Sequence, residues 1–278
     1  MILKRKSLRL AAVLAAAGLC PALALAGGFD FSDLEFQAGG IGIISPKYEG
    51  SKSYEATGLP FVFPGGKDGD DDLSFVDLDS VQYRIIKSGP FEAGPLAGVW
   101  LGRSDSDGAK LGGLGDIDAG LVLGGYGAYR LGYTKFQASY HHQVTGEDVG
   151  GLLRFRADAE VPVAPGFKLL AGVGTNYATN QFMDKNFGVS ASQAATSLAG
   201  LPAYNPGADF KDVFVGAGFE MDLTERWTAR IYGEYSRLIG EAADSPVIET
   251  EDQFSGLFSI SYQFGGHGAA QAASAPLK

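Results

Sequence analysis

The sequence lacks a usable cysteine, a long apolar run and an excess of positive charge. Its one cysteine, Cys20, lies inside an N-terminal segment that we interpret as a removable signal. The remaining chain is therefore expected to form no disulfide and to offer no thiolate to a metal. No later stretch approaches the roughly 18 apolar residues of a transmembrane helix. A formal net charge of −10 argues against nucleic acid as a partner.

Residues 1–26 are predicted to be a secretory signal peptide. They combine a basic start with a short apolar run over Leu10–Leu19 and an Ala-x-Ala cleavage site that ends at Ala26. The basic residues are Lys4, Arg5, Lys6 and Arg9. Their removal makes the exported chain more acidic still, so simple adsorption to anionic lipid is not expected.

Alternation between polar and apolar residues is the main pattern of the exported chain. In Leu152–Pro162 one face carries Arg154, Arg156, Asp158 and Glu160, and the other carries Leu153, Phe155, Ala157, Ala159 and Val161. Period-two alternation places the two sets on opposite faces of a strand. The last such stretch, Asp252–Phe264, ends in Tyr262 and Phe264, as strands at a membrane boundary do.

These strands predict an all-β, antiparallel transmembrane barrel of about twelve strands, with ten as the alternative. Several runs reach the length that a tilted strand needs to cross a bilayer. Short periplasmic turns alternate with longer extracellular loops. We expect a break near Asp79-Ser80 that keeps the strand number even. The predicted strands are 35–44, 54–63, 73–79, 81–87, 91–102, 117–130, 133–144, 151–163, 167–180, 209–222, 226–238 and 253–264.

The barrel is expected to occupy residues 27–264, followed by a disordered tail over 265–278. The tail is rich in Gly and Ala and has no alternation. The longest irregular segment, Gln181–Ala208, contains several large apolar residues, which argues against simple disorder. We expect it to fold over or into the barrel mouth, which would oppose an open pore.

No catalytic, cofactor-binding or metal-binding residue is predicted. His141 and His142 are adjacent, so on a strand they point to opposite faces and cannot share one metal. His141 with a nearby serine would be needed for an outer-membrane lipid hydrolase, but no motif surrounds either residue. The acidic run Asp68–Asp72 lacks the ligand spacing of a calcium loop and is interpreted as a solvated turn.

The charged stripe from Arg154 to Glu160 has two interpretations. It could line a pore that selects solutes. We favour a network with Lys135, Arg230 and Glu234 that fills a narrow lumen, because long side chains leave a small barrel little free interior.

Three stretches go beyond composition. The first is Gly40–Ser51, which contains Pro46-Lys-Tyr-Glu-Gly50-Ser51. The second runs from Phe187 through Gly200-Leu-Pro-Ala-Tyr204 to Val213, and the third runs from Tyr235 to Ile248. Together they resemble the MipA/OmpV family of MltA-interacting proteins from Gram-negative outer membranes. The resemblance spans nearly the whole exported chain, and the third stretch is its most specific part.

The resemblance implies a non-enzymatic outer-membrane scaffold for peptidoglycan synthesis. Such a scaffold would link a lytic transglycosylase to a bifunctional murein synthase, and its surroundings would be outer-membrane lipid and lipopolysaccharide. The family offers no catalytic residues to transfer to this chain. A small-solute outer-membrane channel and a surface adhesin or antigen are the alternative functions.

Overall fold

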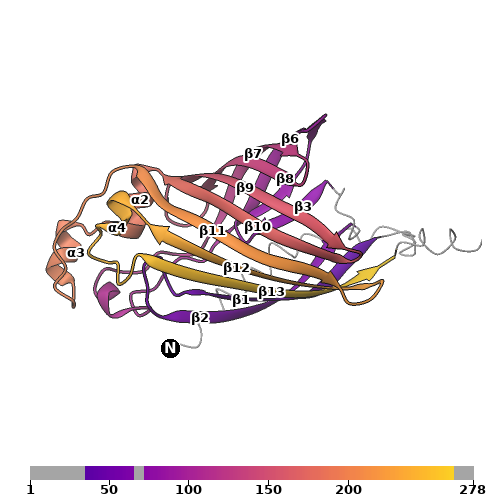
Figure 1. Cartoon of the computed structure of the whole chain (residues 1–278). Helices are drawn as coiled ribbons and strands as arrows, with labels where there is room; N and C mark the ends of the chain where they lie inside the picture. Colours follow the sequence, from indigo (N-terminus) through magenta and orange to yellow (C-terminus); the bar gives the residue numbers. More distant parts are fainter. Residues whose placement is uncertain (1–34, 66–71, 266–278) are drawn as a thin grey trace, which may run out of the picture.

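The computed structural model describes residues 35–65 and 72–265, whose strands form one antiparallel sheet curled into a barrel (Figure 1). The strands are β1 (Phe36–Pro46), β2 (Tyr54–Pro64), β3 (Leu73–Asp77), β4 (Ser80–Tyr83), β5 (Ile86–Ser88), β6 (Phe91–Trp100), β7 (Gly120–Leu131), β8 (Thr134–Gln143), β9 (Gly151–Ala164), β10 (Phe167–Ala178), β11 (Asp209–Asp222), β12 (Trp227–Leu238) and β13 (Asp252–Phe264). Short helical turns in the long connections are η3 (Ala109–Leu111), α2 (Asn180–Phe187), α3 (Ala191–Thr196) and α4 (Gly240–Ala243).

The first and last strands of the barrel pair with each other. The sheet order is β2-β1-β13-β12-β11-β10-β9-β8-β7-β6-β4-β3, with β5 also paired to β6. Phe36 of β1 lies opposite Phe264 of β13, and their rings stack with centroids 4.7 Å apart. The aromatic C-terminal strand therefore joins the ends of the barrel chain, as its pattern predicts.

Within the described ranges twelve strands follow one another around the barrel, so the alternative of ten is wrong. The segment predicted as one strand at 81–87 is divided into β4 and β5, which both pair with β6. Between β4 and β5 the register against β6 shifts by one residue, from Gln82 opposite Leu96 to Ile86 opposite Ala93, while the amide of Arg84 donates to the carbonyl of Asp72 (2.7 Å) and continues the pairing with β3. The expected break at Asp79-Ser80 is the turn between β3 and β4.

The barrel has a seam between β2 and β3. These strands lie at the two ends of the sheet order, and no ladder joins them in the described ranges. Phe63 and Phe75 meet across the seam with ring centroids 5.9 Å apart, in an edge-on arrangement. β2 has 11 residues and β3 has five. The short partner cannot cover the whole free edge of β2.

Side chains alternate between the lumen and the outside along the strands. In β8, Gln137, Ser139 and His141 are buried, whereas Phe136 and Tyr140 are exposed. A polar interior with an apolar exterior is typical of a barrel whose outer face contacts lipid. Other apolar side chains exposed on the strands include Leu123, Phe155, Leu169, Val173, Val215, Ile231 and Phe258.

The long connections gather at one end of the barrel, where α2, α3 and α4 lie (Figure 1). We call the packed loops 100–120, 178–209 and 238–252 the cap, and their end of the barrel the loop end. One cluster of buried residues centres on Phe182, Met183 and Phe187 of α2 and includes Ile117, Val149, Leu152, Leu238, Ala242 and Ile248. A second contains Tyr48, Leu111, Leu114, Val189, Leu201 and Val247. The predicted folding of Gln181–Ala208 over the mouth is therefore confirmed.

Short turns connect the strands at the opposite end, which we call the turn end. They include Ser88–Phe91, Leu131–Thr134 and Ala164–Phe167. None of the helices in the described ranges is long and apolar enough to cross a membrane. The predicted signal peptide, residues 66–71 of the acidic turn and residues 266–278 of the predicted tail lie outside the described residues.

Candidate functional site

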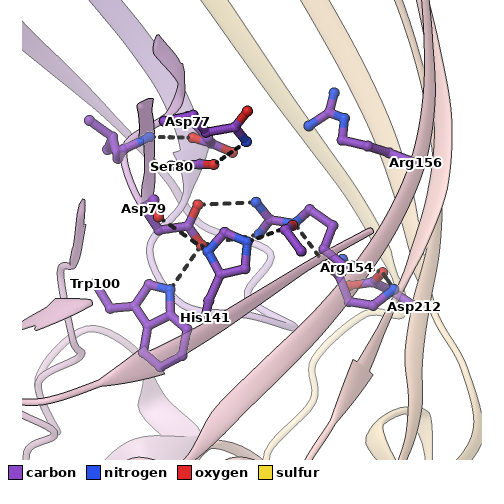
Figure 2. Close-up of polar contacts among 12 residues, drawn as sticks. Asp77, Asp79, Ser80, Trp100, His141, Arg154, Arg156 and Asp212 are labelled. Atoms are coloured by element: carbon purple, nitrogen blue, oxygen red, sulfur yellow. Dashed lines mark hydrogen bonds and ion pairs between the residues drawn. The ribbon is translucent and has the colours of Figure 1, made fainter. Parts of the chain in front are cut away.

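Asp79 is the centre of a polar cluster inside the barrel (Figure 2). It lies in the β3–β4 turn, and its side chain is 8% exposed. Arg154 of β9 donates to both carboxylate oxygens, over 3.0 Å and 3.1 Å. Trp100 of β6 donates its indole N–H to the same carboxylate over 3.0 Å. A bidentate guanidinium–carboxylate pair with a further donor fixes the β3–β4 turn to β9 and β6.

His141 is held by hydrogen bonds at both ring nitrogens. Its Nδ1 lies 3.1 Å from the main-chain oxygen of Asp79, which requires Nδ1 to donate. Its Nε2 lies 2.9 Å from the hydroxyl of Ser139. His142 points to the other face and stacks on Tyr140. The two histidines thus lie on opposite faces, and the described ranges contain no group of three or more His, Cys, Asp or Glu residues that could hold a metal.

Ser139, His141 and Asp79 have the residue types of a hydrolytic triad and contact one another in that order. The sequence analysis considered His141 with a nearby serine but did not place Asp79 beside them. The Asp79 carboxylate is 3.6 Å from Nδ1 and is already bonded to Arg154 and Trp100. Ser139 and His141 are 3% and 0% exposed, and neither lines the main cavity. A nucleophile needs room beside its oxygen for a substrate carbonyl. The arrangement therefore supports a packing role.

The cluster continues across three strands. Arg154 Nε donates to Asn176 of β10 (2.9 Å), whose amide donates to Asp212 of β11 (2.8 Å). Lys211 pairs with Asp212 and with Glu49, the latter over 2.8 Å. Lys211 and Asp212 are both buried. They lie at a register shift, where Asn176 pairs with Asp212 and Tyr177 pairs with Phe210. A β-bulge of this kind re-aims side chains.

The predicted network fills the lumen, but several predicted partners are wrong. Arg156 pairs with Asp158 over 2.7 Å on its own strand and lies over the ring of Phe214. Lys135 is closest to Glu92 (3.8 Å), and Arg230 is closest to Glu220 (3.6 Å). Within the described ranges, Glu160 and Glu234 form no ion pair. Asp79, the partner of Arg154, could not be identified from the sequence, because no residue pattern indicates that the β3–β4 turn bends into the lumen.

A cavity of about 380 Å³ lies between this cluster and the cap. Its walls include Tyr48, Trp100, Arg103, Phe182 and Asn186. Burial, with a smaller contribution from Glu249, raises the pKa of Tyr48 to about 12. Burial lowers the pKa of Arg103 from its ordinary value. On the side of the cap, the cavity wall therefore combines the neutral phenol of Tyr48 with the guanidinium of Arg103, and both side chains are largely removed from solvent.

The three sequence stretches singled out above converge on the cap. Tyr48, Leu201 and Val247, one from each stretch, belong to the same buried cluster. Gly50 has a φ of 90°, and a Cβ there would lie 2.2 Å from Ile248 Cδ1. Only glycine fits this close approach in a left-handed conformation. The three stretches therefore contain the contacts between the β1–β2 loop and the cap.

Tyr204 connects the 178–209 loop to α4. Its hydroxyl donates to the main-chain oxygen of Glu241 over 2.7 Å. Burial and then the Glu241 carboxylate raise the pKa of Tyr204 to about 12. Val189 and Tyr204 also form a two-residue bridge with hydrogen bonds of 2.8 Å in both directions. These contacts turn the 178–209 loop back on itself.

Comparison with known proteins gives one family and a set of barrels. A family model described as MltA-interacting protein MipA matches residues 38–264. Outer membrane protein Omp26La of Vibrio anguillarum is 24% identical over 238 residues, which cover 82% of this chain and 85% of that protein. The solved COG4313 outer membrane channel from Pseudomonas putida F1 aligns with 86% of this chain and 99% of its own, at 8% identity and a TM-score of 0.43. OprG from Pseudomonas aeruginosa aligns with 84% and 98%, at 14% identity and a TM-score of 0.24.

Proposed function

Because this chain belongs to the MipA family of MltA-interacting proteins and is an outer-membrane barrel, we propose that it is a closed, non-enzymatic scaffold. Its partners in this proposal are a lytic transglycosylase and a bifunctional murein synthase, as the family name and the resemblance imply. The loop end then faces outward and the turn end faces the periplasm, where murein enzymes act. Outer-membrane lipid and lipopolysaccharide surround the barrel.

The observation that carries this proposal is the packed cap over the lumen. Met183 and Phe187 are 0% exposed, so the α2 segment is a folded lid that packs against strand ends and the other loops of the cap. Beneath it, Arg154 and Asp79 join β9 to the β3–β4 turn across part of the lumen. A barrel closed by both features is suited to presenting surfaces to partners and poorly suited to conducting solutes at rest.

A scaffold needs a surface at the periplasmic end. The described turns there are short, such as Leu131–Thr134 and Ala164–Phe167. The Gly65–Asp72 turn and the 265–278 tail, both largely outside the described residues, are the longest segments available to a partner. We propose these two segments as the contact region for murein enzymes.

In-cell crosslinking followed by mass spectrometry tests the scaffold. We expect recovery of a murein hydrolase or synthase from the full-length chain. Recovery should be lost when Gly65–Asp72 or the tail is replaced by a Gly/Ser sequence of equal length. The matched control replaces Thr224–Arg226, another turn at the same end. Capture of only other barrels and lipopolysaccharide-associated proteins would contradict the scaffold.

The cavity beneath the cap favours a second candidate, a gated small-solute channel. Charged side chains line it, as they do in selective pores. Single-channel recording in a planar bilayer separates the two candidates. We expect no stable open state from the scaffold, whereas a reproducible open pore would favour the channel. The outer surface of the cap is where the adhesin alternative would place its contacts.

A further inference from the structure

The cavity beneath the cap contains charged side chains that the protein leaves unpaired. Five of its charged lining residues pair with one another, namely Asp79 with Arg154, and Lys211 with Asp212 and Glu49. The other four form no ion pair within the described ranges, and they are Lys47, Glu55, Arg103 and Glu234. Two of these four are basic and two are acidic. The unpaired charges therefore balance within one cavity.

Arg103 is the most unusual of the four. It is 6% exposed, and its Nε and Nη1 atoms have no hydrogen-bond partner in the described ranges. Its remaining terminal nitrogen, Nη2, donates weakly to the carbonyl of Lys185 over 3.4 Å. The buried hydroxyl of Tyr48, on the same cavity, also lacks a hydrogen bond of acceptable geometry. Asp107 attracts Arg103 electrostatically, but the two unpartnered nitrogens of the buried guanidinium lack an acceptor in the described ranges, and a ligand carboxylate would supply one.

Glu234 of β12 is an acidic side chain that calls for a positively charged partner. Its carboxylate lines the same cavity and has no side-chain partner in the described ranges. A ligand amine would satisfy it, because an ammonium group offers three donors and the opposite charge. The two acidic residues in the unpaired set would repel a polyanion, and the two basic residues would repel a polycation. A ligand that carries both signs would satisfy Arg103 and Glu234 together.

We infer that this cavity binds a small zwitterion, such as a free amino acid or a dipeptide, with its carboxylate at Arg103 and Tyr48 and its amine at Glu234. The cavity volume of about 380 Å³ accommodates a ligand of this size. The inference concerns the loop end of the barrel. It is independent of the murein partners proposed for the turn end, so either one can fail alone.

Calorimetric titration of the refolded full-length exported chain in detergent tests the inference with three related probes. Glycylglycine carries both charged groups, N-acetylglycine carries only the carboxylate, and glycinamide carries only the amine. We expect saturable binding of glycylglycine that is about tenfold tighter than binding of either single-charge probe, because each lost ion pair is charge-assisted.

Variants assign the two ends of the ligand. Arg103→Gln should weaken glycylglycine and N-acetylglycine about tenfold and leave glycinamide unchanged. Glu234→Gln should weaken glycylglycine and glycinamide and leave N-acetylglycine unchanged. Arg103→Lys retains the charge and should retain part of the affinity. Arg237→Gln and Glu225→Gln, which lie outside the cavity lining, serve as matched controls.

Thermal unfolding of each variant establishes that the barrel is folded before titration. Absence of saturable glycylglycine binding to the folded unsubstituted chain overturns the inference. Equal binding of glycylglycine to the unsubstituted chain, Arg103→Gln and Glu234→Gln overturns it as well, because the ligand would then bind elsewhere. Failure of the crosslinking experiment affects only the scaffold.

Discussion

At the residue scale, one ion pair, Asp79 with Arg154, connects the β3–β4 turn to β9 inside the lumen. Asp79→Ala leaves Arg154 in a largely buried site without its carboxylate, and we expect a loss of about 3–5 kcal/mol in the free energy of unfolding. Denaturant titration in detergent measures this loss. Asp79→Ala combined with Arg154→Met should recover much of it, because the uncompensated charge is gone. Equal stability of the single and double variants would contradict the pairing.

Ser139 provides a residue-scale test of the absence of catalysis. Its hydroxyl is buried against His141, and Ser139 is not among the described residues that line the cavity beneath the cap. We expect no labelling of the folded protein by a fluorophosphonate probe that reacts with activated serines. Heat-unfolded protein and a known serine hydrolase serve as controls. Labelling of the folded protein that disappears in Ser139→Ala would indicate a hydrolase.

The tyrosines of the cap predict a pH dependence. The pKa of Tyr48 and that of Tyr204 are each raised from 10.0 to about 12, mainly by burial. A group with a raised folded-state pKa contributes stability below its unfolded value and loses it as the pH rises through the folded value. The cap should therefore loosen between about pH 10 and 12. Limited proteolysis across this range measures the effect, and the double variant Tyr48→Phe/Tyr204→Phe should show a weaker dependence.

At the element scale, α2 is held to the cap by packing rather than by helix propensity. It has eight residues, too few for an isolated helix to persist, and Phe187 at its end is fully buried. Phe187→Ala should destabilise the cap by about 3–5 kcal/mol. Faster proteolysis within 178–209, with strand content unchanged by circular dichroism, is the expected result. Gln181→Ala, at an exposed position of the same helix, is the control.

At the scale of the whole molecule, the cap covers the mouth of the barrel, and the lumen network obstructs the interior beneath it. Replacing residues 180–208 by a short Gly/Ser linker removes the first closure but leaves the Asp79–Arg154 pair in place. We expect small, salt-dependent conductance to appear in planar bilayers, and a further increase when Arg154→Met is added. The same linker placed in the turn Asp222–Trp227 should have no effect. Full silence of both deletion variants would show that another part of the lumen closes the barrel.

The sequence by itself determined the barrel. Alternation in strands such as Leu152–Pro162 and the terminal aromatic strand predicted the fold class, the twelve strands around the barrel and the opposite orientations of His141 and His142. These features are local, because period-two alternation fixes the face of each side chain once a strand forms. Folding of the 181–208 loop over the mouth was also foreseen from its apolar content.

Only the tertiary structure decided which charges meet. Asp79 reaches Arg154 because the β3–β4 turn bends into the lumen, and Lys211 turns inward because a bulge shifts its register. Both depend on the curvature of the sheet and on contacts between residues far apart in the chain, such as the 75 positions between Asp79 and Arg154. No local pattern carries that information. The unpaired charges of the cavity became apparent for the same reason, since a missing partner is recognised only when every neighbour has been placed.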